Sequence, residues 1–570
     1  MGLKETITIT ALGNEGQGVG DLSSGKKIFV PAVLPEEVCE VEVTSETARY
    51  AEGICTELKV MSRDRILTYG NFVPGADLAH LSYEAALAYK EDKVRNCLIH
   101  IGRLPAETVY PAMKQILPCV NPLNYRNHMQ YRLVGGKLCL INNFTKMAED
   151  PGNPILEYNI FTTLRYAIEN VFMNAPTNLF EEVVMRGSQN TKDILLEFVS
   201  GSSAPHEVTI GNTNKYVETT GMISKLTAAC QAEGYRITGI TLRISATAVD
   251  KRTRGGKRVL IHGNDYYEEI LLGHKFRIHA GAFFQVNIPE AELLYKSAAR
   301  FTRDAASILD LYCGTGSIGL SLIGAGQKLI GLDTVPEAIR AAKENALMNG
   351  ISNATFYVKP AESIDFATLG LPEPMVVVVD PPRKGLDQLL IRKLLTFQPS
   401  KICYISCDPA TMSRDLGALV GSGIYSLTSV RPVDMFPWTH HVETCVLLSK
   451  LSEAPKLQVN IKMSELDLTA SEAKATYEEI QEYVMAATGL HVSNLNIAQT
   501  KRKYGIIERQ NYNLPKSEDS RQPNCPPEKE IAIVDALKYF KMIQYYNEAP
   551  GDPEAKSSLY HYIIPVLFPH

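Results

Sequence analysis

Apolar and polar residues alternate along the first sixty residues of the chain. The alternation is clear in ETITITAL, KKIFVPAVL and EVCEVEVTS, and glycines and prolines separate these runs. A period of two predicts short strands that each bury one face. Several short strands within residues 1–62 predict a small β-barrel of the OB type. Such a barrel either binds nucleic acid or serves only as a packing module, and the pattern leaves both open.

Residues 63–275 mix helical and strand-like patterns. We expect a helix over 82–102, because Ser82 is a suitable N-cap and Gly102 a suitable terminator. This helix is expected to pack on the domain that follows. A second helix is predicted in ILEYNIFTTLRYAIENVFMNA, and strands are predicted in DILLEFVS, HEVTIGN, GITLRIS and RVLIHG. The region is therefore predicted to be an α+β domain.

From Ala305 onward the pattern changes to strands that alternate with helices. SILDLYCGTGSIGLSLIGAGQKLIGLDTVPEAIRAAKENALMNG predicts a strand, a glycine turn, a helix, a strand and a helix, as in a doubly wound α/β sheet. The turn holds Gly314, Gly316 and Gly319, and Asp333 ends the next strand. Glycines allow the backbone to approach a cofactor, and a carboxylate at that place accepts bonds from ribose hydroxyls. The pattern suits a dinucleotide or S-adenosylmethionine (SAM), so a dehydrogenase and a methyltransferase both remain open.

Further strands bring candidate chemistry to the same edge of the predicted sheet. MVVVVDPPRKGLD ends a fully apolar strand at Asp380, where a carboxylate can bond a flat, polar heterocycle. KICYISCD ends another strand at Cys407, whose thiol is expected to be exposed there. In DMFPWTHHVETCVLLSK, Glu443 stands at the entrance to a final apolar strand.

The tail, residues 454–570, has a helical pattern. A helix is predicted in TASEAKATYEEIQEYVMAATG, with Thr469 or Ser471 as its cap and Gly489 as its terminator. HVSNLNIAQTKRKYG predicts a second helix, residues 511–527 a linker, and PPEKEIAIVDALKYFKMIQYY a third helix with Pro527 at its start. The tail is either a helix-turn-helix module that contacts nucleic acid or a small appendage with a solvated charged face, and we favour the appendage.

Composition narrows the class of protein. The chain has 570 residues and a net charge of −5, so a nucleic-acid surface would have to be a local patch. Its eleven cysteines are scattered and none are spaced CxxC, which argues against a disulfide framework and a zinc ribbon. No apolar run is long enough to span a membrane, and MGLKETITIT lacks the apolar core of a secretion signal. We therefore expect a cytoplasmic protein without membrane association.

Residues 305–450 closely resemble the SAM-dependent RNA uracil-5-methyltransferases. The matching segments, including one just upstream, are GAFFQVN, LDLYCGTGSIGL, VVDPPRKGL, ISCDPATMSRDL and FPWTHHVETCVLL. The N-terminal barrel resembles the TRAM module of the ribosomal-RNA branch of that family. The resemblance implies a TRAM barrel over 1–62, a central RNA-binding α+β region over 63–275 and a Rossmann-like SAM domain over 276–453. The helical extension over 454–570 lies outside the resemblance, and its role is unknown.

The resemblance also implies roles for individual residues. Cys407 would add to C6 of uracil, which turns the poorly nucleophilic C5 into a carbon able to attack the methyl group of SAM. Glu443 would then remove the C5 proton. The residues that match the family's cofactor contacts or glycine turn are Gln285, Tyr312, Gly314, Gly316, Asp333 and Asp380, the last of which would contact either the base or SAM.

Other side chains near these motifs have less specific roles. Asp408 is expected to act as a turn or capping residue, because a carboxylate beside a thiol raises its pKa. One or both of Phe283 and Phe284 are expected in the core, and either could stack on a base. Trp438 could stack on a base, and His440 and His441 would position Glu443, contact phosphate or have only a structural role. Cys313 and Cys403 are expected to be buried packing residues.

One departure from the family concerns metal. Many members of the ribosomal branch bind an iron–sulfur cluster through four cysteines, three of which lie just before the HLSYE segment. The corresponding stretches here, TYGNFVPGADLAHLSYE and FTKMAEDPGNPILEY, contain no cysteine. Cys119 and Cys139 lie between them but cannot supply four ligands. We therefore expect no iron–sulfur cluster and no metal ligands, and a packed loop in their place.

The resemblance leaves the RNA target open. The barrel favours 23S ribosomal RNA as the substrate of a monomeric enzyme, and transfer RNA is the alternative. A non-catalytic protein that binds or folds RNA with the same fold is the second class of function. Because Cys407, Glu443, Asp380 and the glycine turn are all present, we favour the enzyme.

Overall fold

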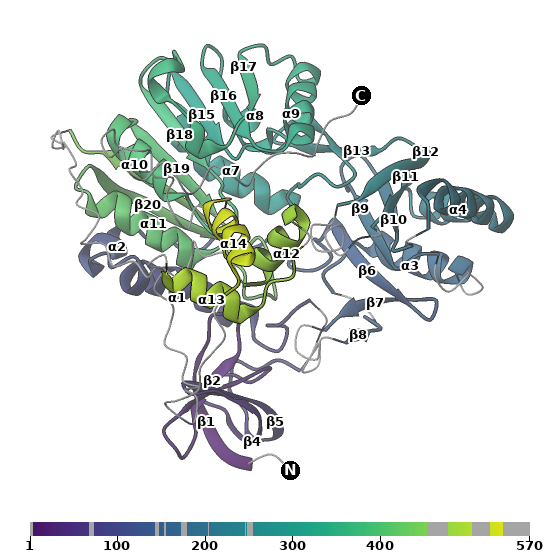
Figure 1. Ribbon diagram of the computed structural model, residues 1–570, viewed down its shortest axis with the longest axis horizontal. Helices are drawn as coiled ribbons and strands as arrows, with labels where there is room; N and C mark the ends of the chain where they lie inside the picture. The colour runs from purple at the N-terminus through teal and green to yellow at the C-terminus, as the bar shows by residue number, and fades with distance from the viewer. Residues whose placement is uncertain are drawn as a thin grey trace. The chain divides into compact units, whose positions relative to one another are not determined.

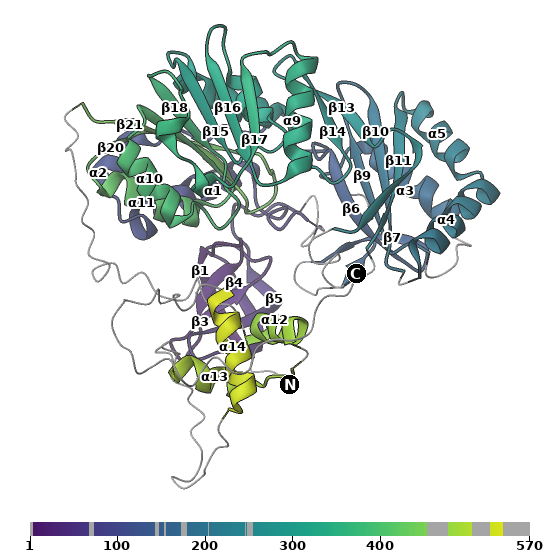
Figure 2. The same ribbon diagram turned by 45° about the horizontal axis from the view of Figure 1, so that its top comes forward.

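The computed structural model divides the chain into two compact units, Met1–Lys456 and Leu457–His570, which are described separately (Figures 1 and 2). Each unit has hydrophobic clusters of its own. The structure describes residues 4–67, 73, 75–142, 147–152, 155–172, 179–202, 204–245, 247, 255–452, 477–488, 490–503 and 525–539.

The N-terminal strands close into a barrel in the order β1-β2-β3-β5-β4. The alternating pattern of the sequence becomes an alternation of buried and exposed side chains, with Ile7, Ile9 and Val41 among those inside. This confirms the predicted OB-like barrel. Its strands are β1 (Lys4–Leu12), β2 (Gly18–Asp21), β3 (Lys27–Val30), β4 (Val38–Glu46) and β5 (Tyr50–Val60).

A helical segment connects the barrel to the rest of the unit. Ser82 caps α1 (Tyr83–Asn96) by accepting a hydrogen bond from the amide of Ala85, and the helix continues as a π-helical turn (Cys97–Ile101) that ends at Gly102. The predicted helix over 82–102 is thus confirmed. A short helix, α2 (Ala106–Ala112), follows. The segment packs against α11 (Pro409–Gly421), because a Cβ atom on Gly102 would lie 2.7 Å from the Ser413 carbonyl oxygen.

The central region is a seven-stranded sheet in the order β12-β11-β10-β9-β6-β7-β8. Three helices lie along one face of it (Figures 1 and 2), and they bury an apolar core with the sheet. The strands are β6 (His128–Val134), β7 (Lys137–Ile141), β8 (Ala148–Glu149), β9 (Glu182–Gly187), β10 (Asp193–Ser200), β11 (Arg236–Ile244) and β12 (Lys257–Gly263), and the helices are α3 (Asn159–Phe172), α4 (His206–Thr220) and α5 (Met222–Ala232).

One strand predicted in this region is wrong. HEVTIGN lies in α4, which begins directly after Pro205. The buried residues of α4 are Thr209, Thr213 and Val217, which recur every four positions and therefore face the sheet from one side of a helix. Tertiary packing of this stripe outweighs the strand preference of its β-branched residues.

The third region is a doubly wound sheet in the order β17-β16-β15-β18-β19-β21-β20. Strand β21 runs antiparallel to the two strands beside it, β19 and β20, and the other paired strands are parallel. Separate apolar cores cover its two faces, so the predicted α/β fold is confirmed. The strands are β15 (Ser307–Leu311), β16 (Lys328–Asp333), β17 (Ala354–Val358), β18 (Met375–Val379), β19 (Lys401–Ser406), β20 (Tyr425–Val433) and β21 (Glu443–Lys450), and the helices besides α11 are α7 (Ile288–Thr302), α8 (Ser317–Leu322), α9 (Pro336–Met348) and α10 (Gln388–Phe397), with 3₁₀ turns at Ala361–Ser363 and Phe366–Thr368.

A hairpin of β13 (Tyr266–Leu271) and β14 (His274–His279) stands between the central region and this sheet. Its apolar side chains share a core with α7, α8 and α9, and Leu195 of β10 joins the same core. The hairpin therefore spans the predicted boundary at residue 275. The domain boundaries stay predictions.

The C-terminal unit contains α12 (Tyr477–Thr488), α13 (Asn494–Lys503) and α14 (Pro527–Tyr539). Ile480, Val484, Ile497 and Ile533 are among the residues of its small apolar core. The three predicted helices are confirmed, with Pro527 as the first residue of α14. The proposed caps Thr469 and Ser471, the terminator Gly489 and most of the predicted linker lie outside the described residues.

Candidate active site

The glycine turn between β15 and α8 is built on left-handed backbone. Tyr312, Gly314 and Gly316 have φ angles of 67°, 54° and 81°, which glycine adopts without a steric cost and tyrosine does not. A Cβ atom on Gly314 would meet nothing within 4 Å, so the space above the turn is open. The turn therefore leaves room for a ligand to approach the backbone.

Asp333, at the end of β16, holds this turn in place. Its carboxylate accepts a hydrogen bond from the Gly314 amide at 3.0 Å and another from the Val335 amide at 2.9 Å. The residues predicted to contact the cofactor thus meet at one edge of the sheet. An open glycine turn beside a strand-end carboxylate fits the ribose-bearing part of a nucleoside cofactor.

Asp310 is a buried carboxyl that the sequence analysis did not single out. One of its oxygens accepts a hydrogen bond from the Gly319 amide at 2.9 Å, and burial raises its pKa to about 8. A Cβ atom on Gly319 would lie 2.7 Å from that oxygen, so only glycine fits there. The signal in the sequence was an acidic residue inside the otherwise apolar strand SILDL.

Gln285 and Asp380 both lie near Tyr295 of α7. Asp380 directly follows β18, and burial raises its pKa to about 7. Gln285 is buried at 5% exposure, and its carbonyl oxygen accepts a hydrogen bond from the Asn127 side chain at 3.0 Å. The hydroxyl of Tyr295 forms a hydrogen bond with the Gln285 side chain, and burial and then the charge of Asp380 raise the pKa of Tyr295. Tyr295 therefore lies near both predicted cofactor residues.

Cys407 follows β19 and is half-buried. Its thiol has a pKa raised to about 11, first by burial and then by the charges of Glu443 and Asp380. The thiol is therefore protonated at neutral pH in the absence of a substrate. Proximity to these two carboxyls places Cys407 at the same edge as the cofactor turn.

Glu443 is the first residue of β21 and is 5% exposed. Burial raises its pKa to about 8, and the charge of Asp380 adds to the rise. A carboxyl with a pKa near the working pH is suited to accept a proton and release it again.

Arg383 is a second residue that the sequence analysis did not assign, although it lies within the quoted segment DPPRKGL. Its guanidinium lowers the pKa of both Cys407 and Glu443, against the larger effect of burial. The positive charge of Arg383 therefore favours the deprotonated forms of both Cys407 and Glu443.

The smaller predictions around the motifs are mostly confirmed. Asp408 caps α11 by accepting a hydrogen bond from the Thr411 amide at 2.8 Å. Cys313 and Cys403 are buried. Phe284 lies in the core, whereas Phe283 is 75% exposed and is free to meet a ligand at the surface.

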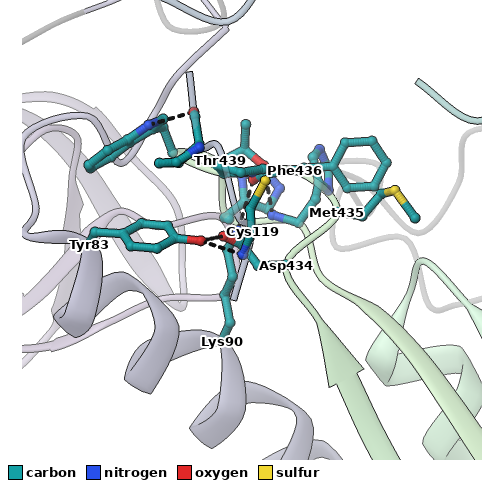
Figure 3. A network of polar contacts seen from close by, with 12 residues as sticks. Tyr83, Lys90, Cys119, Asp434, Met435, Phe436 and Thr439 are labelled. Atoms are coloured by element: carbon teal, nitrogen blue, oxygen red, sulfur yellow. Dashed lines mark hydrogen bonds and ion pairs between the residues drawn. The ribbon is translucent and has the colours of Figure 1, made fainter. Parts of the chain in front are cut away.

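The loop between β20 and β21 is held by a network of polar contacts (Figure 3). The buried ammonium of Lys90 pairs with the Asp434 carboxylate and donates to the Phe436 carbonyl oxygen at 2.8 Å. The hydroxyl of Tyr83 donates to the same carboxylate at 2.7 Å and accepts from the Cys119 amide at 2.7 Å. Cys119 is thus a member of this network.

The contacts of the loop bear on the predictions for Trp438 and His440, and the roles of His440 and His441 stay predictions. Trp438 is 5% exposed and donates to the Pro122 carbonyl oxygen at 2.9 Å, so the stacking role is wrong. Its ring packs 5.5 Å from that of Tyr83. His440 pairs with Asp77 through Nδ1, and its ring lies 4.0 Å from that of His441.

The segment that lacks the family's cysteines is packed with apolar side chains. Val73, Ala76, Ala79 and Leu156 of the two segments are buried in one apolar cluster with Tyr125 and Trp438, which is the packing that we expected there. Within the described ranges, no three His, Cys, Asp or Glu side chains converge to hold a metal ion. The lack of an iron–sulfur cluster stays a prediction. Among the described helices, none combines the length and apolar character needed to cross a bilayer.

Comparison with known proteins decides between the two cofactor classes. Residues 241–451 match the family described as tRNA (Uracil-5-)-methyltransferase, and residues 2–56 match the TRAM domain. An uncharacterised RNA methyltransferase of Oceanobacillus iheyensis is 32% identical over 78% of this chain and 97% of its own length. The chain belongs to the SAM-dependent RNA uracil-5-methyltransferase family, in its TRAM-containing form. It is an RNA methyltransferase with SAM as its cofactor and RNA as its substrate.

One further relative and one solved structure are also similar to this chain. An uncharacterised RNA methyltransferase of Streptococcus pyogenes is 33% identical over 78% of this chain and 96% of its own length. The crystal structure of Pyrococcus abyssi tRNA (uracil-54, C5)-methyltransferase in complex with S-adenosyl-L-homocysteine shares the fold, with a TM-score of 0.60 and 23% identity over 78% of this chain and 99% of that chain.

Proposed function

We propose that this enzyme forms 5-methyluridine in 23S ribosomal RNA, as a monomer, through a covalent adduct between Cys407 and C6 of the target uracil. The observation that carries the proposal is the meeting of a thiol, a carboxyl with a pKa of about 8 and the cofactor turn at one sheet edge.

The reaction begins when the Cys407 thiol passes its proton to solvent and its sulfur adds to C6, which moves the electron pair of the C5–C6 bond onto C5 and O4. The positive charge of Arg383 favours the thiolate. SAM, when bound, would supply the methyl group that C5 then attacks, with S-adenosylhomocysteine as the leaving product. The Glu443 carboxylate takes the remaining proton from C5, the C5–C6 double bond re-forms and the Cys407 thiolate leaves.

The cofactor would lie over the glycine turn. Gly314 and Gly316 leave the backbone accessible, and Asp333 accepts the ribose hydroxyls while it holds the turn. Gln285 and Tyr312 complete the binding side, and Asp380 faces either the base or the cofactor.

Trapping with RNA that carries 5-fluorouridine tests the covalent step, because fluorine cannot leave C5 as a proton does. The native enzyme should form an adduct that survives denaturing electrophoresis. The Cys407→Ala variant should form none and should still bind SAM. A matched control is Cys55→Ala, which removes another half-buried thiol from the barrel strand β5. An adduct with Cys407→Ala would show that another cysteine is the nucleophile.

The RNA target needs a separate test. The TRAM barrel supports ribosomal RNA, while the fold shared with the Pyrococcus abyssi tRNA enzyme supports transfer RNA as a second candidate. Mass mapping of 23S ribosomal RNA and bulk transfer RNA from cells with and without the gene should show the loss of 5-methyluridine in 23S RNA alone. Loss in transfer RNA would reverse the assignment.

A further inference from the structure

Helix α1 presents two lysines, one turn apart, to the loop that precedes Glu443. Lys90 and Lys93 are three residues apart and therefore share one face of the helix. Lys90 holds the beginning of the loop through the Asp434 carboxylate and the Phe436 carbonyl oxygen. Lys93 holds its end, because its ammonium donates to the His440 carbonyl oxygen at 3.0 Å.

The same ammonium of Lys93 also reaches the barrel. It donates to the Asn14 carbonyl oxygen at 2.6 Å, in the turn between β1 and β2. One helical turn earlier, the Tyr89 hydroxyl donates to the Gly13 carbonyl oxygen at 2.7 Å. A Cβ atom on Gly16 of this turn would lie 3.5 Å from the Cβ atom of His440. The barrel turn, α1 and the end of the loop therefore form one contiguous set of contacts.

The chemistry of Lys93 is unusual for a residue that only adds stability. Burial lowers its pKa, which means that its charged form is disfavoured where it lies. The two acceptors are backbone carbonyls and not carboxylates, so no ion pair with them offsets that cost. A half-buried, hydrogen-bonded cation of this kind contributes geometry, because its donors fix two backbone segments relative to each other.

We infer that Lys93 is a positioning residue that ties the TRAM barrel to the catalytic loop and so sets the place of Glu443. The inference rests on the proposed role of Glu443 as the base. Glu443 lies three residues after His440, so a shift of the His440 carbonyl is passed along a short stretch of backbone. The barrel is then part of the machinery that completes the reaction, in addition to any contact it makes with RNA.

The test is Lys93→Met, which keeps the length and the apolar stem of the side chain and removes its donors. Proton removal from C5 should slow by roughly tenfold to a hundredfold, the loss expected when a catalytic group is displaced by about 1 Å. The methylated adduct of Cys407 with unmodified RNA should then accumulate. The affinities for RNA and SAM should stay within about twofold of the native values, because neither site loses a contact.

Tyr89→Phe tests the barrel contact without changing the contact to the loop, because among its described partners the Tyr89 hydroxyl bonds only the barrel turn. Tyr89→Phe should slow the same step, and the double variant should be slower by less than the product of the two single effects. Lys93→Arg should restore most of the rate. Lys296→Met, at an exposed lysine on α7, is the matched control and should behave as the native enzyme.

Several outcomes would overturn the inference. A native rate in Lys93→Met, or a loss of RNA affinity with an unchanged kcat, would show that Lys93 does not position the base. A native rate in Tyr89→Phe would remove the barrel from the proposal, and this variant serves even if Lys93→Met does not fold. Cys407→Ala and Glu443→Gln are measured in the same assays. If Cys407→Ala still methylates RNA, the proposed function fails. If Cys407→Ala is inactive and Lys93→Met has the native rate, only the positioning role of Lys93 fails.

Discussion

Cys407 and Glu443 lie opposite each other at the end of two paired strands. The antiparallel register of β19 and β21 joins Ile405 to Cys445 and Ser406 to Thr444, Cys407 directly follows β19, and Glu443 is the first residue of β21. Burial raises the pKa of the Cys407 thiol, and the two groups are close enough that the charge of Glu443 raises it further. The ends of these two paired strands thus bring the proposed nucleophile and the proposed base close together.

This arrangement predicts the effect of Glu443→Gln. The amide cannot accept the C5 proton, so addition and methyl transfer should proceed while elimination is blocked. Enzyme bound covalently to methylated RNA should accumulate and be visible as a shifted band on denaturing gels. Normal turnover would mean that the base lies elsewhere, and His440 and His441 would then be replaced in turn.

The burial of Glu443 also predicts how stability changes with pH. Its pKa is about 8 in the folded protein against an ordinary value of 4.5, so between these pH values the folded state holds a proton that the unfolded state has lost. Stability should therefore fall as pH rises through this window, by at most about 1.4 kcal/mol per pH unit from this group. Urea unfolding at pH 5.5 and pH 8.5 should show Glu443→Gln to be more stable than the native protein at the higher pH. If the free energies of unfolding of Glu443→Gln and the native protein differed by the same amount at both pH values, Glu443 would not be a buried neutral carboxyl.

The Cys407 thiol should be unreactive in the free enzyme. Its pKa of about 11 leaves little thiolate at pH 7.5, so alkylation by iodoacetamide should be slow and should rise with pH up to about 10. Asp408→Asn removes one of the charges that raise this pKa and should speed the reaction, while the amide oxygen still caps α11. Asp408→Ala loses the cap and should cost about 0.5–2 kcal/mol of stability. Peptide mapping of the alkylated cysteine checks the assignment, and fast alkylation at pH 7.5 would refute it.

The barrel, the doubly wound sheet and the glycine turn could be predicted because their signals are local. Alternation with a period of two marks the barrel strands, and glycines followed by Asp333 mark the cofactor turn. The cap at Asp408 was also predictable, since Asp-Pro before a helix is a local signal. HEVTIGN was mispredicted because its local preference for a strand is outweighed by packing on a distant sheet.

Contacts between distant residues could not be predicted. Lys90 and Asp434 are separated by 344 positions, and nothing in the sequence near either residue indicates a buried pair. Burial also decides the roles of Trp438 and Phe283. The tryptophan packs in an apolar cluster with Ala76, Ala79 and Tyr125, whereas the phenylalanine is left at the surface. Their sequence neighbourhoods did not distinguish them.

The cofactor assignment predicts a specific loss on changing Asp333. Asp333→Asn keeps an oxygen that can accept a backbone amide but loses the charge that would receive ribose hydroxyls. SAM should bind about tenfold or more weakly, since a hydrogen bond to a charged group is worth about 1.5–3 kcal/mol. Calorimetry with SAM and with NADH checks this, and the native protein should bind SAM and show no binding of NADH. Binding of NADH without SAM would overturn the cofactor assignment.

The C-terminal unit offers the last prediction. Its helices bury their own apolar core, and its described polar surface mixes both signs, as in the ion pair of Lys503 with Glu530 at 2.5 Å. A surface of mixed charge attracts a phosphate backbone weakly. Removal of residues 457–570 should therefore leave SAM affinity, RNA affinity and the salt dependence of RNA binding unchanged. Filter binding across a range of salt concentrations measures the RNA affinity and its salt dependence. A separate titration with SAM measures the SAM affinity. A weaker affinity together with a shallower salt slope would show that the tail contacts RNA, which is the alternative that its basic TKRK segment left open.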